Sequence, residues 1–208
     1  MFRMRSAGES NGVGEFWRGR WQSGHTPWDH GRPAPPFAEF VERAGPPQGD
    51  LLVPGCGSGH DVRYFAELGA RVTGLDIAPT AVEVARQRNS HPNAEYQCGD
   101  FLNLEPRWHG RFDWVAEHTC LCALPPACWP AYRDAVRRAL RPGGRFLVIF
   151  YRRPHDPEGP PFGITAEQIG ELFDAGFTLL EAWVPRRSYA SRAGREELRC
   201  YECSGSPR

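Results

Sequence analysis

The chain has 208 residues, of which 40% are hydrophobic and 24% charged, and its formal net charge is zero. This length suits one domain with its own core, and no apolar run approaches the ~20 residues of a membrane helix. The charge balance lacks the basic excess of nucleic-acid binders, and the first residues lack a signal-peptide core. We therefore expect a cytoplasmic monomer whose partner is a small molecule, with no nucleic-acid or membrane partner.

The first 48 residues are set apart by their composition. Residues 1–14 are polar and rich in glycine, which predicts a disordered tail. Residues 15–48 are rich in proline and aromatic side chains, including Trp17, Trp21 and Trp28. We expect residues 15–208 to form a single domain in which the segment 15–48 is an aromatic lid.

Strand and helix patterns alternate from residue 50 to residue 176. The predicted strands are about 51–53, 70–77, 94–100, 111–118 and 145–151, and the predicted helices about 60–68, 79–89, 128–140 and 165–176. The helix that ends at residue 140 is followed by Arg-Pro-Gly-Gly, which predicts a sharp stop. Such alternation is typical of a parallel sheet with helices on both faces.

Two further strands, about 177–184 and 196–203, follow the last helix with no helix between them. The final strand is therefore expected to run antiparallel, because parallel neighbours need a crossover connection. The prediction is a Rossmann-like α/β fold with a mostly parallel seven-stranded sheet and an antiparallel last strand.

Seven cysteines in a chain expected to be cytoplasmic are predicted to be free thiols, mostly buried. The pair Cys200 and Cys203 has a spacing that invites a metal interpretation. However, residues three apart on a strand point to opposite faces, so the two thiols would not share one ion. We therefore predict no metal site.

The stretch LLVPGCGSGHD, residues 51–61, ends a strand in a glycine-rich turn. Such a turn brings the backbone close to a small ligand, which could be a phosphate, a dinucleotide or a sulfonium nucleoside. Gly55 and Gly57 fit a dinucleotide motif, but the third glycine position is His60. The chain has no lysine, which excludes a phosphate-binding loop of the G-x-x-x-x-G-K type.

Acidic residues end the next two predicted strands. Asp76 lies 21 positions after Gly55, where a carboxylate can accept both ribose hydroxyls, and Asp100-Phe101 could frame an adenine. The alternative is that Asp76 and Asp100 merely cap the segments that follow them. Two acids at adjacent carboxyl ends favour ligand contact.

Together these features resemble the class I S-adenosylmethionine-dependent methyltransferases. The narrower resemblance is to the thiopurine methyltransferase superfamily and its halide and thiol methyltransferases. The motifs that carry it are FWRGRWQSGHTPWDHGRPAP, LLVPGCGSGHD, GLDIAPTAVEVAR, Asp100-Phe101, EHTCLCAL, LRPGG and GPPF, over about residues 16–163, with a looser echo in GREEL.

The resemblance implies a set of cofactor-binding positions. These are Trp17, Trp21 and Trp28 around the cofactor, Gly55 at its methionine part, Asp76 at the ribose, Asp100 and Phe101 at the adenine, and in addition Gly57, Ile77 and His118. His118 stands where the plant halide enzymes have tyrosine in a YTFFCAI-like run. This difference alters the acceptor side and weakens the implication of a halide acceptor.

The tryptophans also fit the cofactor on physical grounds. S-adenosylmethionine carries a sulfonium cation, and the indole face is the best side-chain surface for a cation outside water. The alternative is a hydrophobic brace that packs the N-terminal segment onto the sheet.

The expected reaction is transfer of a methyl group to a small thiol, sulfide or halide-like nucleophile by in-line displacement. Trp129, Tyr151 and Phe162 are candidates for the acceptor pocket, although core packing would explain them equally well. No indispensable general base is expected, so the catalytic residues stay unassigned; His118 is the best candidate if a proton must be removed. The alternatives are an O-methyltransferase for a phenolic acceptor and a non-catalytic S-adenosylmethionine sensor.

Overall fold

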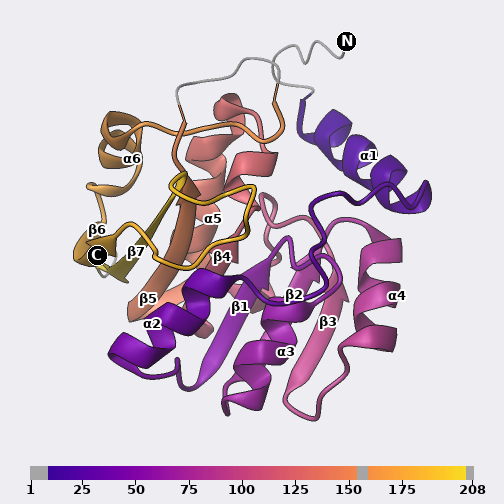
Figure 1. Cartoon of the computed structure of the whole chain (residues 1–208), viewed down its shortest axis with the longest axis horizontal. Coiled ribbons are helices and arrows are strands. Elements are labelled where there is room, and N and C mark those ends of the chain that lie inside the picture. The colour runs from indigo at the N-terminus through magenta and orange to yellow at the C-terminus, as the bar shows by residue number, and fades with distance from the viewer. Residues whose placement is uncertain (1–8, 154–158, 205–208) are drawn as a thin grey trace.

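The computed structural model describes residues 9–153 and 159–204, and a seven-stranded sheet forms its centre (Figure 1). The strand order is β3-β2-β1-β4-β5-β7-β6. The pairings among β1 to β5 are parallel, and β7 is antiparallel to both β5 and β6. The strands are β1 Asp50–Pro54, β2 Arg71–Asp76, β3 Ala94–Cys98, β4 Phe112–His118, β5 Leu140–Tyr151, β6 Phe177–Trp183 and β7 Glu196–Cys203. The predicted mostly parallel sheet with an antiparallel last strand is confirmed.

Helices cover both faces of this sheet. They are α1 Glu9–Gln22, α2 Pro35–Ala44, α3 His60–Glu67, α4 Pro79–Arg88, α5 Trp129–Ala139 and α6 Ala166–Phe173, with short 3-10 turns η1 Pro106–Trp108, η2 Leu121–Ala123 and η3 Pro126–Cys128. Within the described residues, no helix is long and apolar enough to cross a membrane.

The unbroken apolar run of β5 shows how the two faces are filled. Phe146 and Val148 pack in one core cluster, which includes Phe173 of α6. Leu147 and Ile149 pack in the other cluster, which includes Phe37 of α2. Because successive strand residues point to opposite faces, a strand covered on both sides carries apolar residues at every position.

The structure differs from the sequence-based expectation at two places. Helix α1 begins at Glu9, inside the segment 1–14 that the composition predicts to be disordered; residues 1–8 lie outside the described residues. Strand β5 begins at Leu140 rather than Arg145, so Arg-Pro-Gly-Gly lies within the strand. The pairing with β4 shifts there, between Phe112 and Trp114, as an irregularity of the ladder rather than a break.

Strand β7 separates the two cysteines whose spacing resembles a metal motif. Cys200 packs in the cluster that contains Phe37, whereas Cys203 packs in the cluster that contains Phe173. The two thiols therefore lie on opposite faces of the sheet, as the strand pattern predicts. None of the seven cysteines forms a disulfide.

Candidate active site

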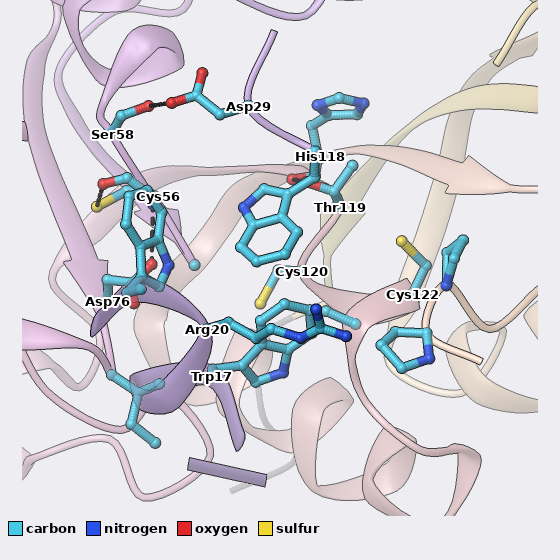
Figure 2. A pocket seen from close by; sticks show the side chains of 18 of the residues that line it. Trp17, Arg20, Asp29, Cys56, Ser58, Asp76, His118, Thr119, Cys120 and Cys122 are labelled. Carbon is cyan, nitrogen blue, oxygen red and sulfur yellow. Dashed lines mark hydrogen bonds between the residues drawn. The ribbon is translucent and has the colours of Figure 1, made fainter. Parts of the chain in front are cut away.

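A cavity of about 420 Å³ lies at the edge of the sheet where β1, β2, β3 and β4 end. Its size falls within the range of small-molecule sites, and this edge is where ligands bind in open α/β sheets. Figure 2 shows labelled side chains of α1, of the glycine turn and of the end of β4 arranged around it. The lining residues come from α1 and the loop after it, the β1–α3 turn, the segments after β2, β3 and β4, and the β6–β7 loop.

The glycine turn after β1 forms part of the cavity wall. Gly55 and Gly57 have φ values of +60° and +53°, the left-handed region that glycine adopts without steric cost. A Cβ on Gly55 would lie 2.9 Å from Sγ of Cys120, and one on Gly57 would lie 3.3 Å from the Trp21 ring. Both positions therefore require glycine for conformation and for space.

Asp76 ends β2 and holds this turn in place. Its carboxylate accepts hydrogen bonds from the backbone N–H groups of Gly57 and Ala78, each at 2.9 Å. Its side chain is buried, and desolvation raises its pKa. Asp76 thus has the capping role that was the alternative interpretation, while it also lines the cavity together with Ile77.

Asp100 and Phe101 line the cavity after β3. The Asp100 carboxylate accepts bonds from the backbone N–H of Leu102 at 2.9 Å and from the side-chain amide of Asn103 at 2.6 Å. Phe101 packs edge-on against Tyr132, with 5.3 Å between the ring centroids. These contacts fix both side chains before any ligand is present.

The three tryptophans of the N-terminal segment meet at the cavity. Trp28 lies edge to face with Trp17, with centroids 5.0 Å apart, and with Trp21, with centroids 6.2 Å apart. Helix α1 is held against the β2 end by the Arg18 side chain, whose Nε donates to the carbonyl oxygen of Ile77. The arrangement presents indole surface to the cavity and also packs the segment onto α4, where Ala78 and Ala81 contact Trp21.

A polar network joins the tryptophan segment to the glycine turn through the carboxylate of Asp29. Its Oδ2 accepts from the Ser58 hydroxyl at 2.7 Å (Figure 2). Its Oδ1 lies 3.0 Å from Nε2 of His60 and accepts from the N–H of Gly31. Nδ1 of His60 lies 3.3 Å from the amide nitrogen of Asn89, so the histidine donates from Nε2. These bonds lower the pKa of Asp29 against the opposing effect of burial.

Asp29, Ser58 and His60 do not form a nucleophilic triad. In such a triad the histidine lies between the serine and the acid, whereas here the carboxylate lies between the serine and the histidine. The arrangement activates no hydroxyl. It anchors the loop that carries Trp28.

The end of β4 is shaped by a buried carboxyl group. Oε1 of Glu117 accepts the backbone N–H groups of Cys120 at 2.7 Å and of Leu121 at 3.2 Å. Thr119 lies between Glu117 and Cys120 in the chain and adopts a φ of +67°. This value is uncommon for a threonine, and such backbone strain often occurs at functional sites. Desolvation raises the pKa of Glu117 to about 7.

The wall opposite the glycine turn combines the loop after α1 with the β6–β7 loop. Tyr189 stacks on His30, with ring centroids 3.9 Å apart, and its hydroxyl donates to the carbonyl oxygen of Arg32 at 2.7 Å. Burial and the positive charges of His118, Arg192 and Arg32 lower the pKa of His30. This wall is therefore aromatic and electropositive.

The ten sequence-predicted cofactor positions all line this cavity. The three acceptor candidates lie elsewhere: Trp129, Tyr151 and Phe162 line a separate void of about 10 Å³ and are buried in the core. The alternative interpretation of these three aromatic residues was packing in the core, and their burial agrees with that interpretation. Cys122 lines both spaces.

The sequence analysis missed several lining residues. Asp29, Ser58, Tyr189 and Arg192 were not selected. Asp29 follows Trp28 directly, and that adjacency was a usable signal. Tyr189 and Arg192 lie in an irregular loop with no motif, so only the fold brings them to the cavity.

The residues present fit S-adenosylmethionine. Indole surface suits its sulfonium, the glycine turn leaves space that a Cβ would fill, and carboxylates follow both β2 and β3. The sheet order, the antiparallel β7 and the site at the carboxyl edge define a Rossmann-like class I methyltransferase.

Comparison with known proteins identifies the family. Residues 13–195 match the family model of Thiopurine S-methyltransferase (TPMT), so the chain belongs to this family. The resemblance stated above is confirmed, and so is the enzyme class, a methyltransferase that uses S-adenosylmethionine.

Three similar proteins support this assignment. "Probable thiol methyltransferase 2" of Arabidopsis thaliana is 34% identical over 201 residues, which cover 94% of this chain and 86% of that protein. Thiocyanate methyltransferase 1 of Brassica oleracea is 33% identical over 187 residues, covering 88% and 82%. A structure solved for "Conversion of a Disulfide Bond into a Thioacetal Group during Echinomycin Biosynthesis" superposes with a TM-score of 0.76 at 26% identity, covering 94% and 93%.

The glycine turn can be tested with two matched substitutions. Gly57→Val should abolish binding of S-adenosylhomocysteine, because its side chain would enter the cavity beside Trp21. Gly110→Val is the control, since Gly110 has a similar φ of +63° and open space around it. Calorimetric titration should show wild-type affinity for the control; equal affinity of both variants would remove Gly57 from the site.

The Asp29 network should contribute to cofactor affinity. Asp29→Asn keeps only one acceptor oxygen, so Ser58 and His60 can no longer both donate to this side chain, and the loop with Trp28 must be ordered on binding. We expect affinity for S-adenosylhomocysteine to fall about tenfold or more. The exposed Asp134→Asn on α5 should leave affinity unchanged. Unchanged affinity in Asp29→Asn would show that the loop is held by its aromatic contacts alone.

The raised pKa of Glu117 predicts how the stability of the folded protein changes with pH. Its pKa is raised from 4.5 to about 7, so its contribution to stability is present at low pH and is lost as the pH rises through about 7. Glu117→Gln stays neutral and keeps an acceptor oxygen. From about pH 5 to about pH 8 its melting temperature should rise relative to wild type by on the order of 5 °C. The exposed Glu67→Gln is the control; parallel curves for Glu117→Gln and wild type would contradict the shift.

Proposed function

We propose that this protein transfers the methyl group of S-adenosylmethionine to a small thiol, sulfide or halide-like nucleophile. The observation that carries the proposal is one cavity with two unlike halves. The half at β1, β2 and β3 has the glycine turn, Asp76 and Asp100; the half at β4 and the β6–β7 loop has His118, Cys122 and Tyr189. The similarity to thiol and thiocyanate methyltransferases supports the acceptor class.

In this proposal each cofactor-side residue has one task. Asp76 and Ile77 contact the ribose, Asp100 and Phe101 contact the adenine, and the backbone of Gly55 and Gly57 meets the methionine part. Trp17, Trp21 and Trp28 face the sulfonium and exclude water. The placement of all these residues at one cavity supports the assignment.

The reaction needs orientation and a dry site. S-adenosylmethionine supplies an electrophilic methyl group and a neutral thioether leaving group. An anionic nucleophile and a sulfonium lose their charges together, so exclusion of water by the tryptophans favours reaction. The walls of the cavity hold the nucleophile in line behind the methyl group, and this orientation supplies several kcal/mol.

We further propose a cytoplasmic monomer that acts on small molecules. The absence of disulfides among the seven cysteines suits a reducing compartment. The formal net charge of zero does not favour a nucleic-acid partner.

A panel of acceptors tests the proposed function. Incubation with methyl-labelled S-adenosylmethionine should yield labelled products from thiols, bisulfide, thiocyanate or iodide, with S-adenosylhomocysteine released in equal amount. A catechol is the control and should stay unlabelled. Methylation of the catechol alone would favour the O-methyltransferase alternative. Binding of S-adenosylmethionine with no product from any acceptor would favour a sensor.

A further inference from the structure

A histidine–carboxylate pair spans the acceptor half of the site. His118 is the last residue of β4 and Glu196 is the first of β7, with β5 between these strands. Nε2 of His118 lies 3.3 Å from Oε1 of Glu196. Both side chains lie on the face covered by α2, where Phe37 contacts the imidazole edge-on.

The pair is buried, yet one of its members reaches the cavity. The side chains of His118 and Glu196 are 7% and 2% exposed, and His118 lines the cavity. Glu196 orients the imidazole so that Nε2–H points to its carboxylate. Within residues 9–153 and 159–204, Nδ1 of His118 has no hydrogen-bond partner, and neither has Oε2 of Glu196. A buried carboxylate beside an imidazole with a free nitrogen is the arrangement of an oriented base.

We propose that His118 and Glu196 form a general-base dyad that takes the proton from a neutral thiol acceptor. This inference rests on the proposed methyl transfer. The S–H proton moves to Nδ1 of His118, while the thiol sulfur forms a bond to the methyl carbon. The bond from that carbon to the sulfonium sulfur breaks, and its electron pair stays on the departing thioether. The imidazolium, held by Glu196, then returns its proton to water.

Charged groups face His118 from several of the elements packed around it. Asp61 faces it from α3, and Glu117 precedes it on β4. Both carboxyl groups, like Glu196, favour a positive imidazole. His30 opposes it from the loop after α1, and Tyr189 contacts the ring from the β6–β7 loop, with centroids 5.7 Å apart. Arg192 and Arg32 act on the neighbouring His30, so cations as well as carboxyl groups surround this end of the pair.

A base of this kind matters only for an acceptor that carries a proton. Thiocyanate and iodide are already anions, whereas most alkane thiols are largely protonated at neutral pH. The wall thiols do not compete, because burial raises the pKa of Cys122 to about 11 and raises the pKa of Cys120 well above its usual range. The dyad therefore points to neutral thiols rather than halides as the acceptor class.

A series of thiols of increasing pKa tests the dyad. His118→Gln should lose little kcat/KM with an arylthiol already ionised at the assay pH. The loss should grow to about 10²-fold or more with an unactivated alkane thiol. His109→Gln, a substitution at a histidine outside the cavity that contacts the carbonyl oxygen of Leu104, is the control. An equal loss across the series would overturn the dyad, whereas a wild type that methylates no thiol would overturn the proposed function instead.

Two further measurements separate a base from a packing role. In the dead-end complex of S-adenosylhomocysteine with the unactivated alkane thiol, the ultraviolet spectrum should show thiolate in wild type and thiol in His118→Gln. Glu196→Gln should lower both the plateau of kcat/KM and the pH at which its acid limb falls, because the imidazolium loses its carboxylate. If His118→Gln fails to fold, the plateau of kcat/KM and the acid limb of Glu196→Gln test the dyad. Identical spectra and an unmoved acid limb in Glu196→Gln would overturn the proposal.

Discussion

The carboxylate of Asp29 is the contact on which the cavity depends. It accepts from Ser58 in the glycine turn, lies within hydrogen-bond distance of His60 at the start of α3, and accepts from the N–H of Gly31 in its own loop. The tryptophan segment precedes the first strand and has no ladder bonds to the sheet, so polar contacts of this kind fix its position. Trp28, the neighbour of Asp29, touches both other tryptophans. Trp28 therefore links the anchored carboxylate to the other two indoles.

The last two residues of β4, Glu117 and His118, point to opposite faces of the sheet and make different polar contacts. Glu117 points to the α5 face, where its carboxyl group holds the turn at Cys120 and Leu121. His118 points to the α2 face, where it meets Glu196. A one-residue slip of this strand would exchange the two side chains and remove both functions. The register that fills the two cores thus also sets the chemistry of the acceptor side.

The sequence predicts the sheet, and it selects ten residues that the fold brings to one cavity, because both depend on local patterns. Apolar periodicity marks the strands, and the glycines and Asp76 lie at fixed distances along the chain. Trp129, Tyr151 and Phe162 show the limit of this reasoning, since burial and site lining favour the same aromatic residues. Local patterns cannot predict the roles of Glu196 and Tyr189. For example, 78 residues separate His118 from Glu196, and only the strand order brings these two together. Helix α1 began earlier than composition suggested, because Val13 and Trp17 pack against the core.

The direction of β7 explains why a late element completes the site. Parallel strands bring their carboxyl ends to the ligand edge, so a parallel β7 would place its last residues there. The antiparallel strand brings its first residue instead, and Glu196 pairs in register with Tyr151 near the end of β5. The loop that enters β7 then carries Tyr189 and Arg192 over the same edge. The reversal of one strand therefore brings to this edge of the cavity side chains that the β-α units do not provide.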